Sequence, residues 1–134
     1  MERAKSFPYL DIFWVEECRC VLLQWKGGAL GRDLHAGMNA ALEELRARGT
    51  GAQLIGDTTH IGQLSDEEQT WINTDWHPRF LATGTHYLAA VLPASVVAKM
   101  NLSSTLQKYE GTNLTVFSCA SQKEAIDWMK SVNT

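Results

Sequence analysis

The chain has 134 residues, of which 45% are hydrophobic and 20% charged, and this is the size and composition of one globular domain. We therefore expect a single domain over residues 1–134, and the apolar content excludes wholesale disorder. The net charge of −3 supplies no general attraction for nucleic acid or for an anionic membrane, and the basic residues form no long run.

Nothing in the sequence predicts a membrane-targeting segment. Basic residues occur near the start, but Pro8 and Asp11 interrupt any apolar core of a signal peptide. No stretch approaches the ~20 apolar residues of a membrane-spanning helix. Three cysteines cannot all pair within one chain, so at least one thiol stays free. We therefore expect free thiols and a cytoplasmic location.

The N-terminal part predicts a β-hairpin followed by a helix. Residues 9–15 are rich in aromatic and β-branched side chains, which favour a strand, and Glu16-Glu17 turn the chain into a second strand over 20–26. Asp33 is a suitable N-cap for the helix that follows. One apolar face at helical spacing comprises Leu34, Met38, Ala41, Leu42 and Leu45.

A buried strand in the middle of the chain ends in polar residues. The short apolar run 52–56 is typical of a strand inside a sheet, and Asp57, Thr58 and Thr59 follow it directly. Ligands of an open α/β sheet meet the protein at the carboxyl ends of its strands. These residues and His60 are therefore candidates for a ligand or partner surface. The alternative is that their side chains only tie down the loop through local hydrogen bonds.

A capped helix is predicted after this loop. Ser65 and Glu68 have the S-x-x-E spacing of a capping box, so the helix should begin there. Pro78 fits poorly inside a helix, and it biases the preceding residue away from helical geometry. We predict a break or kink near Trp76-His77 and then a short helix from Pro78 to Gly84.

The rest of the chain alternates strands with helices. Strands are expected at 87–92 and 114–118, with one helix from Ser95 continuing irregularly to Tyr109 and another after Ser121. Such alternation predicts an α/β fold with a mixed, mostly parallel sheet of about five strands. The N-terminal hairpin supplies the antiparallel pairing, and the helices pack on the sheet.

This element order and several short motifs resemble the STAS-like family, whose domain is shared by sulfate transporters and anti-sigma-factor antagonists. The likeness is strongest to small stand-alone bacterial members described as anti-sigma-factor-antagonist-like, a fold group also compared with CRAL-TRIO lipid-transfer domains. It implies a STAS-like fold and a regulatory role through a protein partner. The residues that carry it are Gly56-Asp57-Thr58-Thr59, Leu64 to Gln69 with Trp71, Asp75 to Arg79, Gly84 and Glu124-Ala125 with Trp128.

Members of that family that act as phosphorylation switches carry two short segments. Asp57-Thr58-Thr59 fits the first, Asp-x-Ser/Thr. The second, Asp-Ser-Ser/Thr-Gly, is absent, and its nearest equivalent around Ser65 lacks the glycine. Thr58, Thr59 and Ser65 are the candidate phosphoacceptors. Ser65 is more strongly predicted to be a helix cap, because its acidic neighbours would repel a phosphate.

Aromatic residues of the capped helix form a second candidate surface. Ile72, Trp76 and Phe80 recur at i, i+4 and i+8, with Trp71 beside them and Arg79 on the same segment. Such a stripe most often packs into the core. Alternatively it lines an apolar pocket for a lipid-like molecule beneath the kinked helix, or marks a protein-binding patch if it is exposed.

No catalytic or metal-binding motif accompanies these surfaces. The four histidines lack ligand spacing, and no serine or cysteine has a base at a recognisable spacing. We expect no enzyme activity, no metal and no cofactor. The first hypothesis is a non-enzymatic interaction module that binds a protein partner or a second copy of the chain. The second is a carrier or sensor of a hydrophobic small molecule. The third is an enzyme whose site is assembled from distant residues.

Overall fold

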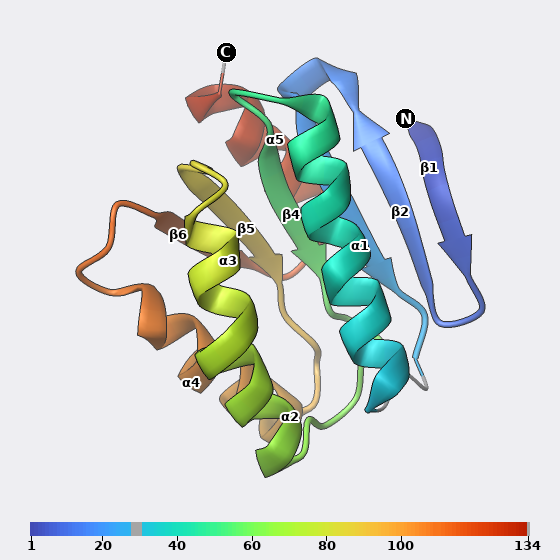
Figure 1. The fold of residues 1–134 in the computed structure, drawn as a ribbon, viewed down its shortest axis with the longest axis vertical. Coiled ribbons are helices and arrows are strands. Elements are labelled where there is room, and N and C mark those ends of the chain that lie inside the picture. The colour runs from blue at the N-terminus through green and yellow to red at the C-terminus, as the bar shows by residue number, and fades with distance from the viewer. Residues whose placement is uncertain (28–30, 134) are drawn as a thin grey trace.

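The strands of one mixed sheet lie side by side in the order in which they occur along the chain (Figure 1). The computed structural model describes residues 1–27 and 31–133. Neighbours from β1 to β3 pair antiparallel, and those from β3 to β6 pair parallel. This confirms the predicted mixed sheet with an N-terminal hairpin. The strands are β1 (Glu2–Phe7), β2 (Leu10–Val15), β3 (Cys20–Trp25), β4 (Gln53–Asp57), β5 (Tyr87–Val91) and β6 (Thr115–Cys119).

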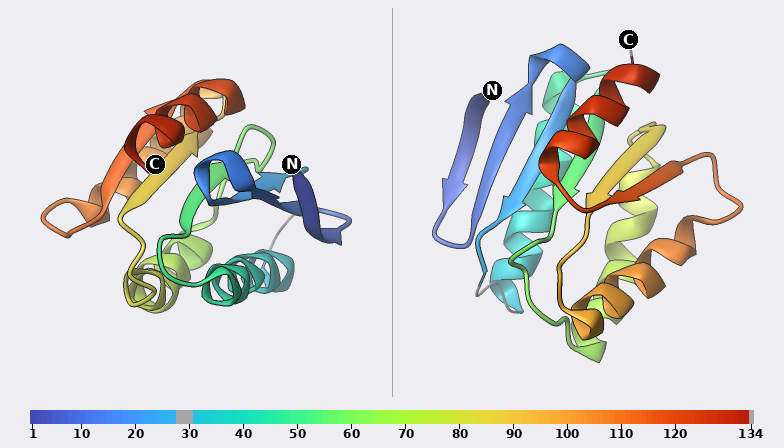
Figure 2. Two further views of the ribbon diagram at one scale, coloured as in Figure 1. Left: turned by 90° about the horizontal axis from the view of Figure 1, so that it is seen from above. Right: turned by 180° about the vertical axis from the view of Figure 1, so that it is seen from behind.

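Helices cover both faces of the sheet, with α1, α2 and α3 on one face and α5 on the other (Figure 2). Residues of α4 contribute to the same core as α1. Because each parallel strand lies beside its predecessor, every crossover helix returns across the same face. In the described residues, no helix is long and apolar enough to cross a membrane. The helices are α1 (Arg32–Arg48), α2 (Asp66–Trp71), α3 (His77–Leu81), α4 (Val96–Leu106) and α5 (Gln122–Val132), with short turns η1 (Glu16–Cys18), η2 (Ile72–Trp76) and η3 (Gln107–Tyr109).

The first strand, β1, was not predicted. Its sequence ERAKSF is charged and mostly exposed, and the register with β2 shifts between Arg3 and Lys5. Charged and irregular edge strands resist pairing with other chains, and they carry little of the apolar alternation from which strands are recognised. The sheet therefore has one strand more than expected.

The helix that begins at Asp66 is not broken at Pro78, but it is irregular just before it, so the expected break or kink near Trp76-His77 takes the form of a π-helical turn. The helix continues to Leu81 through this turn, η2, and the His77 N–H donates to the Ile72 carbonyl five residues back. In a regular α-helix the Pro78 ring would clash with the carbonyl four residues earlier, and the wider turn relieves that clash. The capping box of Ser65 and Glu68 is confirmed at the start of this helix.

The start of α1 differs from the prediction. The helix begins at Arg32 with Gly31 as N-cap, so Asp33 lies in its first turn and does not cap it. A carboxylate oxygen of Glu68, in α2, accepts a hydrogen bond from the Gly31 N–H at 3.0 Å. The N-terminal ends of two helices far apart in sequence are therefore joined by one buried side chain.

Cys18 and Cys20 lie in the same core. Cys18 belongs to η1 instead of a strand, and Arg19 between them has a left-handed φ of 52°. Both cysteines and Cys119 are free thiols buried in the core that includes α5 residues.

Candidate functional site

A cavity of about 90 Å³, partly open to solvent, lies between the sheet and the helices that include α1 and α4. Gly56 and Ala90 line it and pair with each other across β4 and β5. A Cβ atom added at Gly56 would meet no atom within 4 Å. Two small residues side by side on the sheet therefore leave space that the covering helices do not fill. Interiors are normally packed with few voids larger than a water molecule, so this space is unusual.

The continuous helix from Asp66 to Leu81 forms the roof of the cavity. Trp76 lines it and is 3% exposed. Its indole N–H donates to the Met38 carbonyl of α1 at 2.8 Å, and its ring stacks on Phe80 with 4.9 Å between ring centroids. These contacts fix the position of the indole, so it forms an ordered part of the cavity wall. Further apolar lining comes from Ile72, Leu54, Leu88, Leu102 and Leu106.

The buried polar side chains that line the cavity include His77 of α3 and Tyr109 at the end of η3. His77 is 6% exposed and Tyr109 3%. Their rings meet edge to face, with 4.2 Å between centroids. Both imidazole nitrogens and the tyrosine hydroxyl lack a hydrogen-bond partner among the described residues. Nearly all buried polar groups in proteins are paired, so this cluster requires an explanation.

Burial keeps both side chains uncharged at neutral pH. Desolvation, with a smaller contribution from the charge of Lys108, lowers the pKa of His77 from 6.5 to about 4. Desolvation raises the pKa of the Tyr109 hydroxyl. Among the described lining residues there is no Asp, Glu, Lys or Arg. The cavity is therefore apolar with one uncharged polar end.

His77 should make the stability of the protein depend on pH between 6.5 and about 4. In this range the unfolded chain takes up a proton that the folded chain does not, because the folded pKa lies below the unfolded one. The free energy of unfolding should therefore fall as the pH decreases through this range. We expect the free energy of unfolding, measured in urea, to decline less steeply with falling pH in His77→Phe than in the wild type. The control His86→Phe, at an exposed position, should decline as steeply as the wild type. Equal declines in wild type and His77→Phe would contradict this prediction.

The polar residues at the end of β4 mostly bond to one another and to nearby backbone. One carboxylate oxygen of Asp57 accepts from the N–H and hydroxyl of Thr59, at 3.0 and 2.5 Å, and the other accepts from the Gln122 side chain at 2.7 Å. The Thr58 hydroxyl donates to the Val91 carbonyl at 2.6 Å, and Thr58 also lines the cavity. His60 is exposed. This pattern favours the interpretation that the side chains of residues 57–59 hold the loop after β4 in place.

The other predicted site residues lie outside the cavity lining. The Ser65 hydroxyl accepts from the Glu68 N–H at 3.1 Å as a helix cap. Trp71 stacks on His35 with 3.8 Å between centroids, and Phe80 is fully buried behind Trp76. Of the residues predicted as a surface, the cavity thus brings together Thr58, Ile72 and Trp76.

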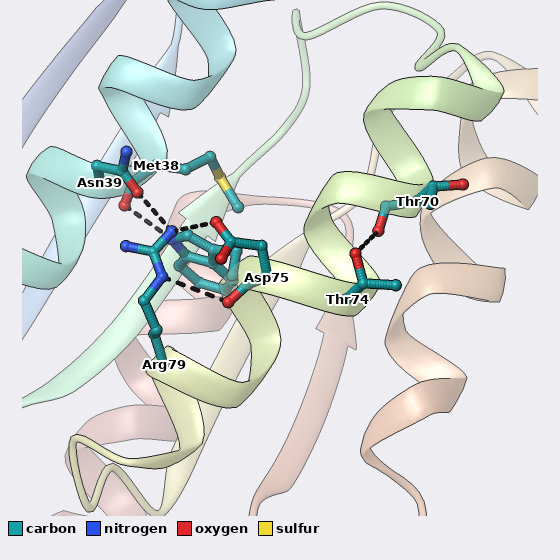
Figure 3. Close-up of polar contacts among 7 residues, drawn as sticks. Met38, Asn39, Thr70, Thr74, Asp75 and Arg79 are labelled. Atoms are coloured by element: carbon teal, nitrogen blue, oxygen red, sulfur yellow. Dashed lines mark hydrogen bonds and ion pairs between the residues drawn. The ribbon is translucent and has the colours of Figure 1, made fainter.

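Arg79 holds the helices together on the outside of the molecule. Its guanidinium donates to the Asn39 side-chain oxygen of α1 at 2.8 Å and to the Asp75 carboxylate at 2.9 Å (Figure 3). The same figure shows Thr74 donating to the Thr70 carbonyl, a side-chain bond within the helix. Arg79 therefore positions the roof of the cavity and does not face it.

Searches of protein-family models, curated proteins and solved structures find no match to this chain. Among the described residues, no three His, Cys, Asp or Glu side chains are placed to hold a metal ion. The site therefore has to be interpreted from its own geometry. The residues that sequence reasoning missed as site residues are Gly56, His77, Ala90 and Tyr109, which are distant in sequence and show no shared local motif.

Proposed function

We propose that this protein binds a small hydrophobic molecule in the cavity beneath the helix from Asp66 to Leu81, as a non-enzymatic carrier or sensor. The cavity itself is the observation that supports the proposal. Binding sites for small molecules are usually concave and apolar with a few placed polar groups, and π-helical turns occur frequently at functional sites. The cavity has apolar walls, buried polar side chains that include His77 and Tyr109, and a π-helical turn, η2, in its roof.

The volume limits what can be bound. An engineered apolar cavity of ~150 Å³ in another protein binds benzene, and the cavity here is about 90 Å³. Without rearrangement the space therefore fits a short alkyl group, and an aromatic ring fits only if a lining side chain moves. Met38 lines the cavity and is only half-buried, and a flexible methionine side chain can adjust to enlarge the space.

Gly56→Val should abolish binding of an apolar probe without unfolding the protein. The valine side chain would occupy the space next to Ala90, and a β-branched residue suits a strand. We expect wild-type protein to bind toluene, detected by chemical-shift changes of cavity methyl groups, and Gly56→Val to bind it at least about tenfold more weakly, a difference of ~1.4 kcal/mol.

Thr115→Val is the matched control for this experiment, because it also introduces valine into a strand but at an exposed position in β6. It should bind toluene as the wild type does. Thermal unfolding should show that Gly56→Val remains folded, with a midpoint equal to or above that of the wild type, since filling a cavity commonly stabilises a protein. If folded Gly56→Val binds toluene normally, the cavity is not the binding site.

We also propose membership of the STAS-like family, a bacterial source and a cytoplasmic location. The family proposal is supported by the motifs around Asp57 and Trp76 and by the element order, in which a hairpin precedes alternating helices and parallel strands. The location is supported by three free cysteines. Because this fold group is also compared with CRAL-TRIO lipid-transfer domains, a pocket for an apolar molecule beneath the helix agrees with the family proposal.

A non-enzymatic interaction module is the second candidate function. The observation that favours it is an apolar surface on α4, where Val96, Val97 and Met100 are 71%, 52% and 67% exposed. Exposed apolar clusters of this kind often bind a partner protein. The double variant Val97→Ser/Met100→Ser leaves the cavity lining intact. If α4 binds a partner, the complex recovered with wild-type protein should be lost with this variant and retained with Gly56→Val.

A further inference from the structure

The polar end of the cavity indicates what chemical group its ligand carries, an inference that rests on the proposed function. His77 and Tyr109 come from different elements, α3 and η3, and meet at the cavity with three polar atoms lacking partners among the described residues. A side chain needed only for packing would be phenylalanine or leucine at such a place, since an unpaired buried polar group is unfavourable. Two of them at one end of one apolar cavity are typical of a binding site.

We propose that the ligand is a small uncharged alcohol or phenol whose hydroxyl group bonds to the unpaired polar atoms of His77 and Tyr109 and whose apolar body lies against Gly56 and Ala90. A neutral imidazole offers one donor and one acceptor, and a tyrosine hydroxyl also donates and accepts. A ligand hydroxyl does the same, so it can bond to both side chains at once. A purely hydrocarbon ligand would leave all three atoms unpaired.

The charge of the site excludes ionic ligands. His77 is uncharged at neutral pH because burial lowers its pKa to about 4. The described lining residues include no carboxylate, ammonium or guanidinium group. A carboxylate or amine ligand would therefore be buried without an opposite charge, which is strongly unfavourable. A hydroxyl group pairs with one imidazole nitrogen and the tyrosine hydroxyl, and it keeps the cavity neutral.

Phenol and toluene form a matched pair of probes, because they have similar size and differ by a hydroxyl in place of a methyl group. We expect His77→Phe and Tyr109→Phe each to weaken phenol binding about tenfold and to change toluene binding less than about twofold. Tyr109→Phe removes a single oxygen atom, so it keeps the packing. The control is Tyr87→Phe, since Tyr87 packs on Trp128 away from the cavity.

A spectroscopic measurement separates direct contact from a structural effect. Phenol should shift the imidazole ¹⁵N resonances of His77 in the wild-type protein, and toluene should leave them nearly unchanged. If the two variants weaken phenol and toluene equally, or leave phenol binding unchanged, the inferred hydroxyl site is wrong while the cavity can still bind apolar molecules. If wild-type protein binds neither probe, the proposed function itself is wrong.

Discussion

Replacing Glu68 by glutamine should lower the free energy of unfolding by about 3 kcal/mol. Glu68 is 6% exposed, and its carboxylate accepts from the N–H of Ser65 at 2.9 Å and from that of Gly31 at 3.0 Å. Hydrogen bonds to a charged group contribute about 1.5–3 kcal/mol each. Glutamine keeps one acceptor oxygen but turns its amide N–H groups toward the other backbone donor. One charge-assisted bond is lost and the second is weakened.

The effect of Glu68→Gln should depend on pH. Burial acts to raise the pKa of Glu68, but hydrogen bonds from Ser65 and Gly31 outweigh it, and the pKa is lowered. A carboxylate with a lowered folded pKa contributes stability that is complete above its unfolded pKa and is lost as the pH falls through the folded value. The difference between wild type and variant should therefore be largest near neutral pH and shrink in acid.

Urea unfolding at pH 7 and at pH 3.5 measures this difference. Glu67→Gln is the matched control, because Glu67 lies in the same helical turn but is exposed, and it should change stability by less than about 0.5 kcal/mol. An effect of Glu68→Gln that is equally small, or that does not shrink in acid, would contradict the role assigned to this carboxylate.

Glu68 also shows where sequence reasoning succeeds. The capping box was predictable because all of its atoms lie within four consecutive residues, so the S-x-x-E spacing is sufficient. The interior strands were predictable for the same reason: β4 and β5 are short apolar runs bounded by polar residues. These local signals account for the correct α/β fold class and the N-terminal hairpin.

The features that were missed depend on residues far apart in the chain. Gly31 caps α1 with help from Glu68, which lies 37 positions away. The cavity exists because Gly56 and Ala90, on different strands, are both small and lie in register. The sequence pattern within each strand does not indicate that Gly56 and Ala90 lie opposite each other. The hydroxyl of Tyr109 has no partner within residues 1–27 and 31–133 because the fold buries it against His77.

Trp76→Ala should lower the free energy of unfolding by about 3–5 kcal/mol, the usual range for removing a buried tryptophan side chain. The indole is 3% exposed, stacks on Phe80 and donates to the Met38 carbonyl. Because Trp76 also forms a wall of the cavity, the space that it vacates joins the existing 90 Å³. The variant should therefore contain a larger apolar cavity, and the Met38 carbonyl in its wall should lose its second hydrogen bond.

Free indole should restore part of this stability, because it can occupy the vacated space and bind only the folded state. A ligand at 100 times its dissociation constant stabilises the folded state by ~2.7 kcal/mol. Thermal unfolding of Trp76→Ala with increasing indole measures the rescue. Trp71→Ala is the control, since Trp71 is only partly buried, stacks on His35 and does not line the cavity. Indole should not rescue it.

The position of the bound indole can be tested with 1-methylindole, which has a similar ring system but no N–H donor. If indole returns to the place of the Trp76 side chain, its N–H again donates to the Met38 carbonyl, and 1-methylindole should bind Trp76→Ala more weakly by about 0.5–1.5 kcal/mol. Equal stabilisation by the two compounds would place indole elsewhere in the enlarged cavity. Rescue of Trp71→Ala as well as Trp76→Ala would show that indole does not act through this cavity.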